Sequence, residues 1–344
     1  MVAQAVDRED PNLGAFYYWF ETMARRVSSL TVIAQRVGPG GAPPGVRVLS
    51  LGKERGALRA ARIAKFLILF ARLFVKSDAV LFHQIPEFAV AVSPLLLLRG
   101  RRVSGLWYAH GSVSRRLRAA ERLMDYVFTS SEAGFRIPSK KAIHLGQAVN
   151  TDLFCPASGV SSSGSGLRLI TVGRISPVKN LETIVDACAM LRNARQDAFT
   201  LSIVGGPITA HDAAYCSRVR SLIRARGLDD AVRFYGNLPY SRVPAMLRAH
   251  DVFVNASATG SLDKAVLEAM ACGLTVLTSN EAYRAILPPR YFLEHKSAEL
   301  LAARITAFRD EPRPNKGLRD IVVRDHALRR TIDRMARYLE TPVR

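Results

Sequence analysis

Short apolar runs alternate with longer amphipathic segments along most of the chain. Several runs are apolar at consecutive positions and rich in β-branched residues, as in strands covered on both faces. We predict strands at 31–34, 79–83, 103–108, 126–129, 167–172, 200–204, 232–235, 252–255 and 275–278. Apolar residues recur at helical spacing between them, which predicts helices at 14–27, 58–75, 114–123, 181–192, 213–226, 242–249 and 264–272. This alternation is typical of an α/β protein with parallel sheets.

One break in composition divides this pattern near the middle of the chain. Residues 158–166 are rich in Gly and Ser and carry no charge, which is typical of a flexible linker. A length of 344 residues also favours two domains. We therefore predict a first domain over 1–157 and a second over 167–323, with a cleft between them as the place for a ligand.

Composition excludes several classes of protein. With 49% hydrophobic and 23% charged residues, the chain is neither disordered, nor collagen-like, nor a small disulfide scaffold. The four cysteines form no CxxC pair, so we expect reduced, mostly buried thiols. The first residues lack a basic start followed by an apolar block, and no apolar run reaches the ~20 residues that a spanning helix needs. We expect a cytoplasmic protein.

A formal charge of +20 indicates an anionic partner: a membrane surface, a nucleic acid or a phosphorylated substrate. The chain has no aromatic-rich basic strand and no helix-turn-helix pattern, which disfavours nucleic acid. The segment 53–76 is the most basic. Helical spacing puts five apolar residues on one side (Ile63, Phe66, Leu67, Phe70, Phe74) and five basic residues over the other (Arg55, Arg62, Lys65, Arg72, Lys76). It is either an ordinary helix with a solvated basic face or a face close to anionic lipid.

The strongest local feature follows the strand predicted at 167–172. That strand runs into Gly173, and a turn leads to a helix that opens near Asn180. Folds of this kind place ligands where the chain leaves the carboxyl end of a parallel strand. Arg174 and Lys179 reach that edge together, and an Arg fork with a Lys point charge suits a diphosphate. A solvated loop would have a similar pattern.

A second feature lies at 255–273 and reads as strand, Gly-containing turn and helix. Backbone N–H groups at the start of that helix could hold a phosphate. Glu268 lies one helical turn after Lys264, so the two could form a surface ion pair. Apolar residues follow Glu268, however, and a carboxylate in such surroundings has an assigned hydrogen-bonding partner, for which a sugar diol is one option.

These motifs resemble a known family. The stretch 167–287 resembles the C-terminal donor domain of the retaining glycosyltransferases of family 4, which have the GT-B fold of two Rossmann-like domains facing each other across a cleft. The matching pieces occur in family order with family-like spacing: 172–174 with 179–180, 203–207, 232–236, 250–254 and 267–273. Weaker motifs extend the resemblance over most of the chain. In this fold the last helix often returns to the first domain, which we expect of 324–344.

The resemblance implies roles for the donor-side residues. Arg174 and Lys179 would bind the diphosphate of a nucleotide-sugar. Glu268 would be the second Glu of the family's E-x7-E motif and hold the ribose hydroxyls. Gly205 and Gly206 would let the backbone approach the nucleotide. The remaining expected donor contacts are Gly173, Tyr235, Gly260, Ser261, Leu262 and Lys264.

The chain departs from the family pattern at the first Glu of that motif. Gly260 occupies its position, and Gly260-Ser261-Leu262-Asp263 replaces the usual Glu-Gly-Phe-Gly turn. The first Glu normally contacts the donor sugar, and this chain has no carboxylate at that position. Asp263 could supply a carboxylate instead, although it lies three positions after the family's first Glu. We treat Asp263 as a catalytic candidate together with Arg174 and Lys179.

The first half resembles the family's acceptor domain. Residues 4–7 would end its first strand, and the following loop with Asp10, Asn12 and Gly14 would face the cleft. The family often has a His near the reacting sugar at a strand end, and His110 is the candidate here. A capping or structural role for His110 stays open.

The resemblance implies a metal-independent enzyme that transfers a sugar from a nucleotide-diphosphate-sugar to an acceptor hydroxyl with retention. No further cofactor is expected, because basic side chains and a helix N-terminus would carry the leaving-group charge. The acceptor would be a glycan or a lipid-linked molecule, and the basic first domain could lie at the inner membrane face. A nucleotide-sugar epimerase and a non-catalytic relative that only binds the donor are the alternatives.

Overall fold

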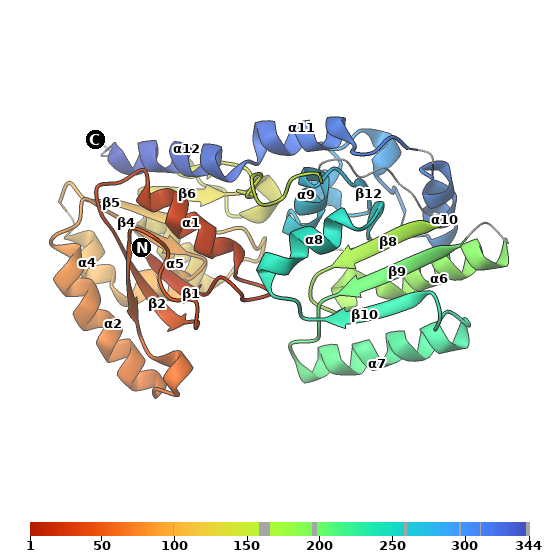
Figure 1. Cartoon of the computed structure of the whole chain (residues 1–344). Helices are drawn as coiled ribbons and strands as arrows, with labels where there is room; N and C mark the ends of the chain where they lie inside the picture. The colour runs from red at the N-terminus through yellow and green to blue at the C-terminus, as the bar shows by residue number, and fades with distance from the viewer. Residues whose placement is uncertain are drawn as a thin grey trace. The chain divides into compact units, whose positions relative to one another are not determined.

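The computed structural model describes residues 1–98, 100–157, 166–194, 198–257, 260–295, 297–309 and 311–341. It consists of two compact units (Figure 1). Unit 1 comprises Met1–Ala148 and Asp325–Arg344, and unit 2 comprises Val149–Arg324. The boundary between the units therefore precedes the predicted linker, of which residues 158–165 lie outside the described residues.

Unit 1 is built on a seven-stranded, all-parallel sheet with the order β3-β2-β1-β4-β5-β6-β7. Its strands are β1 (Val2–Val6), β2 (Leu30–Val37), β3 (Val46–Ser50), β4 (Ala79–His83), β5 (Val103–Trp107), β6 (Tyr126–Thr129) and β7 (Ala142–His144). The strand order reverses between β1 and β4. The carboxyl ends of these two strands therefore flank the position where such sheets place a ligand.

Helices cover both faces of this sheet. On one face α1 (Ala15–Ala24) and α12 (Leu328–Glu340) pack in one core that contains Trp19, Trp107 and Met335. On the other face a second core contains Phe70, Phe82 and Leu117. The helices of that face are α2 (Arg59–Phe74), α3 (Pro86–Ala91), α4 (Ser93–Leu97) and α5 (Arg115–Leu123). The C-terminal helix α12 thus belongs to unit 1.

Unit 2 has a five-stranded parallel sheet with the order β10-β9-β8-β11-β12. The strands are β8 (Leu167–Val172), β9 (Phe199–Val204), β10 (Val232–Gly236), β11 (Val252–Asn255) and β12 (Thr275–Thr278). The helices are α6 (Leu181–Asn193), α7 (Ala210–Ala225), α8 (Val243–Arg248), α9 (Lys264–Ala271), α10 (Ala298–Ala307) and α11 (Lys316–Asp325). Its strand order reverses between β8 and β11, so their carboxyl ends define the expected ligand position.

Both units confirm the predicted α/β class with two parallel sheets. Each predicted strand is present, and β1 was expected only from the resemblance, whereas β3 and β7 were not predicted at all. β3 and β7 differ from the other strands in exposure. Both are edge strands with mostly half-buried or exposed residues, so they lack the consecutive apolar positions of a central strand. No helix in the described part of the chain is both long and apolar enough to cross a membrane.

The apolar side predicted for the segment 53–76 is wrong in part. Phe66, Phe70 and Phe74 are buried against the sheet, but Ile63 and Leu67 are exposed. The helix contacts its sheet through one ridge of residues spaced four apart, and this ridge is narrower than the apolar surface of the helix.

Candidate functional site

Glycines form the carboxyl edge of the sheet in unit 2. Gly173 directly follows β8 with φ +142°, and Gly205 directly follows β9 with φ +126°, values that favour glycine. A Cβ atom at Gly205 would overlap the carbonyl oxygen of Gly173, so these backbones meet directly. Gly173 N donates to Val204 O (2.9 Å), and Gly205 N donates to Gly236 O (2.8 Å). Because neither Gly173 nor Gly205 has a side chain, the backbone at this edge of the sheet stays uncovered.

Two cations flank this edge. The Arg174 side chain is exposed, and its Nε lies 3.9 Å from the buried carboxylate of Asp212 at the start of α7. Lys179 ends the short turn η3 (Pro177–Lys179), and its ammonium forms an ion pair with the Asp263 carboxylate. A Cβ at Gly173 would lie 3.3 Å from Lys179 Cε, which puts the lysine against the end of β8. Arg174 and Lys179 are thus brought to one edge, as predicted from their spacing.

Hydrogen bonds hold the turn that carries Asp263 in place. Asn255 Nδ2 donates to Asp263 Oδ2 (3.1 Å), and the hydroxyl of Tyr283 donates to Asp263 O (2.6 Å). Asn280 Nδ2 donates to Ser261 O (2.9 Å). These three supporting residues were missed in the sequence. An Asn directly at or after a strand end was the available signal for Asn255 and Asn280.

Glu268 lies on α9 and is buried, so the pair with Lys264 is not a surface ion pair. Tyr240 supplies the partner that such a carboxylate needs, because its hydroxyl donates to Glu268 Oε1 (2.6 Å). Desolvation raises the pKa of Glu268 and lowers the pKa of Lys264. Tyr240 was not predicted, because nothing in its local sequence pattern connects it with a residue 28 positions away.

The other predicted donor residues differ in exposure. Gly206 O accepts from Ile175 N (3.0 Å), so Gly206 lies at the same edge as Gly173. Leu262 is buried and supports the turn from within, whereas Gly260 and Ser261 are half-buried. Tyr235 is exposed near the end of β10.

At the corresponding edge of unit 1, Asp10 closes the turn before α1. Its Oδ1 accepts from Asn12 N (2.8 Å) and Leu13 N (2.7 Å), and its carboxylate forms an ion pair with Arg36 of β2. Gly14 N donates to Asp10 O (2.9 Å) and Gly14 is buried, whereas Asn12 is exposed. The structure thus gives Asp10 and Gly14 local structural contacts and leaves Asn12 accessible on this turn.

His110 follows β5 in the same unit. The residue is exposed, and its ring packs edge-on against Tyr108 with centroids 5.6 Å apart. Neighbouring protein atoms desolvate the ring and lower the pKa of His110 from the usual 6.5. The imidazole is therefore mainly neutral at neutral pH and can accept a hydrogen bond.

Gln84 is a candidate that the sequence patterns did not identify. It follows β4 with φ +62°, an uncommon conformation for a residue other than glycine. Its Oε1 accepts from Ala109 N (3.3 Å), directly before His110. Such strained positions cost about 1–3 kcal/mol and cluster at functional sites. Gln84 and His110 together thus mark the carboxyl ends of β4 and β5.

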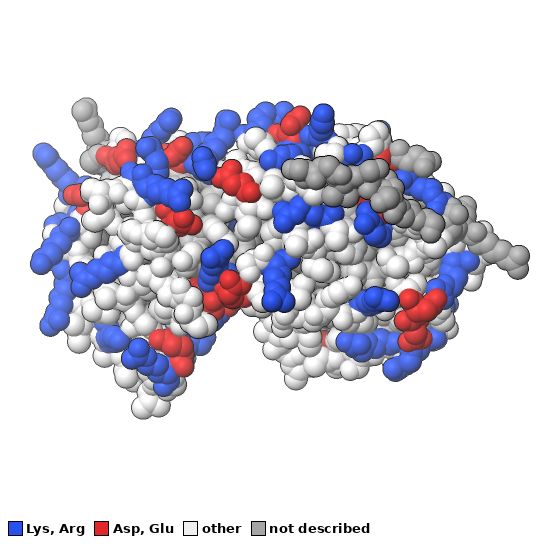
Figure 2. Space-filling model, in the orientation of Figure 1, with Lys and Arg blue, Asp and Glu red and all other residues white. Residues whose placement is uncertain are grey.

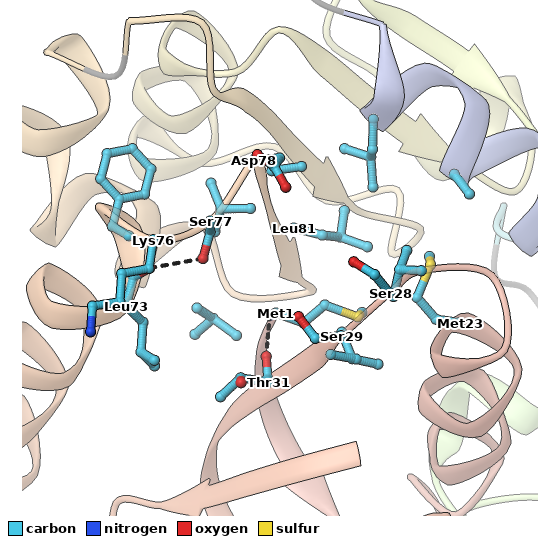
Figure 3. Close-up of a pocket in the computed structure, with 18 of the residues that line it drawn as sticks. Met1, Met23, Ser28, Ser29, Thr31, Leu73, Lys76, Ser77, Asp78 and Leu81 are labelled. Atoms are coloured by element: carbon cyan, nitrogen blue, oxygen red, sulfur yellow. Dashed lines mark hydrogen bonds between the residues drawn. The ribbon is translucent and has the colours of Figure 1, made fainter. Parts of the chain in front are cut away.

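A cavity of about 470 Å³ lies elsewhere in unit 1 (Figure 3). Its lining includes Thr31 at the start of β2, Ala79 at the start of β4, and Leu73 and Lys76 at the end of α2. The cavity therefore lies at the amino ends of β2 and β4. His110 and Gln84 follow the carboxyl ends of β5 and β4, so the cavity is at the opposite edge of the sheet. Among the described residues, no group of three His, Cys, Asp or Glu side chains has a geometry that could hold a metal ion.

The fold is that of GT-B glycosyltransferases. HepE from Anabaena, solved in complex with UDP and glucose, has a TM-score of 0.76 over 99% of both chains at 16% identity. Sucrose-phosphate synthase from Thermosynechococcus elongatus has a TM-score of 0.77 over 98% of both chains at 18% identity. These similarities confirm the predicted two-domain fold.

Sequence comparison points to a particular family for the second half. Residues 162–319 match the family model of Glycosyl transferases group 1. WcaL of Salmonella typhimurium, provisionally named a colanic acid biosynthesis glycosyltransferase, is 29% identical over 280 residues. That match covers 77% of this chain, and the chain spans 59% of the length of WcaL. These matches support the expectation of a transferase enzyme.

Proposed function

We propose that the protein is a retaining glycosyltransferase of family 4 that moves a sugar from a nucleotide-diphosphate-sugar to an acceptor hydroxyl. The observation that carries this proposal is the edge of unit 2, where the Gly173–Gly205 backbone contact lies beside Arg174 and Lys179. The UDP and glucose in the similar HepE structure support a nucleotide-sugar as the donor. The nucleotide-sugar is a co-substrate, and the proposal includes no further cofactor and no metal.

Charge on the departing diphosphate is the main chemical demand of this reaction. Arg174 supplies an exposed guanidinium that can form two parallel hydrogen bonds to phosphate oxygens. Lys179 supplies a second positive charge at the end of β8. Fixed donors of this kind stabilise the transition state more than the ground state, because the charge grows as the bond to the sugar breaks.

We assign Asp263 the role of positioning Lys179. Their ion pair is mostly buried, and Asn255 also donates to the Asp263 carboxylate. Asp263 thus supplies an acidic group near the position where the family has its first Glu, although it comes from a different point of the turn. We assign Glu268, held by Tyr240, to the ribose hydroxyls. A carboxyl with a raised pKa can both donate to and accept from a diol.

We assign the acceptor to unit 1. Asn12 is exposed on the turn after β1, and His110 offers a mainly neutral imidazole to a sugar hydroxyl. WcaL carries a name from colanic acid biosynthesis, which supports a glycan or lipid-linked acceptor in polysaccharide biosynthesis. Such acceptors occur at the inner membrane face, where we place the protein as a peripheral enzyme.

The test is a transfer assay with the Arg174→Ala variant. Purified protein is incubated with UDP-, GDP- and ADP-sugars and a mixture of oligosaccharide and lipid-linked acceptors, and products are identified by mass spectrometry. We expect Arg174→Ala to lower kcat/KM about 100- to 1000-fold while the fold is retained. Arg233→Ala, which removes an exposed arginine from β10, is the matched control and should transfer normally. Equal turnover of both variants would contradict the assignment.

One observation favours a second candidate function. Gly260 replaces a carboxylate that the family uses for sugar contact, which suits a relative that binds the donor and does not turn it over. Such a protein would show nucleotide-sugar binding that depends on Arg174, with no product from any acceptor. A nucleotide-sugar epimerase would instead convert the donor in the absence of an acceptor.

A further inference from the structure

The composition of α2 is unusual for a surface helix. Its 16 residues contain four basic residues and otherwise only apolar ones, with no acidic or neutral polar side chain. A helix that covers a sheet normally turns polar residues to solvent. Burying its apolar ridge against the sheet therefore cannot account for all of its apolar surface.

The outward side of α2 is apolar in the structure. Phe66, Phe70 and Phe74 face the core and are almost fully buried. Several large apolar residues of α2 and the residue that follows it are exposed: Ile63 (43%), Leu67 (39%), Ile68 (53%) and Val75 (60%). Ala60, Ala61 and Ala64 are exposed as well. Water therefore contacts a nearly continuous apolar strip along this helix.

A second exposed apolar segment lies beside the end of α2. Arg102 Nη2 donates to Val75 O (2.8 Å), and its guanidinium lies 5.6 Å from the centre of the Phe74 ring. These contacts bring the chain that follows α4 against the end of α2. Leu97 ends α4 and Leu98 follows it, and they are exposed by 70% and 82%.

Basic side chains surround these apolar residues. Lys65, Arg72, Lys76 and Arg101 are all exposed. Blue side chains gather along the flank of unit 1 that carries α2 and α4, with white surface between them (Figures 1 and 2). Acidic residues nearby are Glu54 before α2, Asp78 after Lys76, and Glu87 on α3, which lies 3.8 Å from Arg116. We call the exposed apolar and basic residues of 60–76, together with Leu97, Leu98 and Arg101, the basic apolar face.

We propose that the basic apolar face docks unit 1 onto an anionic lipid surface. The exposed Ile, Leu and Val side chains would enter the boundary between headgroups and acyl chains, and the lysines and arginines would contact lipid phosphates. Charge complementarity favours lipid as the partner, because α2 carries only positive charges. Apolar side chains interleaved with these charges would gain nothing from a nucleic-acid backbone. This inference rests on the membrane placement in the proposed function and names the surface responsible. It uses elements other than the donor edge, so failure of the vesicle test would leave the transferase assignment intact.

Vesicle co-sedimentation of the full chain tests this surface without any nucleotide. We expect binding to vesicles of phosphatidylglycerol and phosphatidylethanolamine, and much weaker binding to vesicles of phosphatidylcholine alone. The double variant Lys65→Gln/Arg72→Gln should lower the partition coefficient about 30-fold, since each basic residue near the surface contributes ~1 kcal/mol. Arg224→Gln/Arg233→Gln removes the same charge from exposed positions of unit 2 and should bind as the unmodified protein does.

A second pair of variants tests the apolar part. Ile68→Ser should lower binding to the anionic vesicles about tenfold. Val323→Ser, which changes an exposed apolar residue of α11 in unit 2, should have no effect. All changed positions are exposed, and an unchanged melting temperature verifies the fold. The proposal is overturned by equal binding to both kinds of vesicle, by losses of the same size in variants and controls, or by competition from RNA that removes the protein from vesicles.

Discussion

The carboxyl edges of the two sheets present different chemical groups. In unit 2 the edge consists of glycine backbone and charged side chains, with Gly173 against Gly205, Lys179 paired with Asp263, and Arg174 exposed beside them. In unit 1 the corresponding edge carries side chains on turns: Asp10 bound by backbone amides, Gln84 in a left-handed conformation and His110 beside Tyr108. The same topology thus supports two kinds of surface.

This difference matches the ligands that we assign to the two units. The diphosphate is the same in every nucleotide-diphosphate-sugar, so backbone and fixed charges can recognise it. Glycines and basic residues close together in the sequence are a strong signal for such a site. An acceptor differs from one enzyme to the next, and side chains on turns can change without disturbing the sheet. The comparison implies that unit 2 is sensitive to small changes in backbone and charge, whereas unit 1 tolerates them.

Gly205→Ala should have the largest effect. The new Cβ would overlap the Gly173 carbonyl at a φ that alanine rarely adopts, and we expect the free energy of unfolding to fall by about 3–5 kcal/mol. Gly227→Ala is the control, because that glycine has φ +64° and open space around it, and it should cost about 1 kcal/mol. Urea unfolding measures both. Equal losses of unfolding free energy in the two variants would mean that the close approach of Gly205 to Gly173 does not contribute to stability.

Asp251→Asn tests the buried charges of unit 2. The carboxylate accepts from Arg168 Nη2 (2.6 Å) and Arg168 N (2.8 Å), and it also pairs with Arg313. Burial opposes its charge, but the hydrogen bonds and both arginines outweigh burial and lower the pKa of Asp251 below 3.8. We expect the substitution to cost about 3 kcal/mol at neutral pH.

The pH dependence gives a second readout for Asp251. A carboxylate with a lowered pKa contributes stability above pH 3.8, and this contribution is lost as the pH falls through the lowered pKa. In Asp251→Asn, the acid part of a plot of unfolding free energy against pH should be flatter. Asp229→Asn, which changes an exposed carboxylate on the turn before β10, should leave that plot almost unchanged. Parallel curves for the unmodified protein and Asp251→Asn would contradict the buried ion pair.

Tyr240→Phe removes one hydrogen bond from the ribose candidate. Glu268 would lose a buried donor, and we expect nucleotide affinity to fall about tenfold and stability by about 1–2 kcal/mol. The same chemical change in unit 1, Tyr338→Phe, should leave nucleotide affinity as it is. Titration calorimetry with the nucleotide that binds best measures the difference. If Tyr240→Phe binds nucleotide normally, Glu268 does not depend on Tyr240.

Asp10→Asn should have the smallest effect. An asparagine oxygen can still accept from Asn12 N and Leu13 N, so only the ion pair with Arg36 is lost, and we expect a cost below about 1 kcal/mol. Asp10→Ala removes the acceptor as well and should cost about 1–2 kcal/mol. A larger loss in Asp10→Asn than in Asp251→Asn would reverse the proposed contrast between the units.

The sequence predicted the fold and the grouping of Gly173, Arg174 and Lys179 because their signals are local. Most central strands show as runs of apolar residues, and these three residues lie within a few positions of one another. Contacts between distant segments could not be predicted in this way. Tyr240 reaches Glu268 only after folding, and the conformation of Gln84 leaves no sequence pattern. The outward side of α2 was misassigned because helical spacing offered more apolar positions than the sheet buries.

A thermal-shift screen of the unmodified protein and Arg174→Ala against UDP, GDP, ADP, CMP and TDP tests the central claim most directly. A ligand that binds only the native state adds ~2.7 kcal/mol of stability at a hundred times its dissociation constant. The account predicts a rise in melting temperature with one of these nucleotides, and loss of most of that rise in Arg174→Ala. The absence of a shift with every nucleotide, or equal shifts in both proteins, would contradict the assignment of the unit 2 edge.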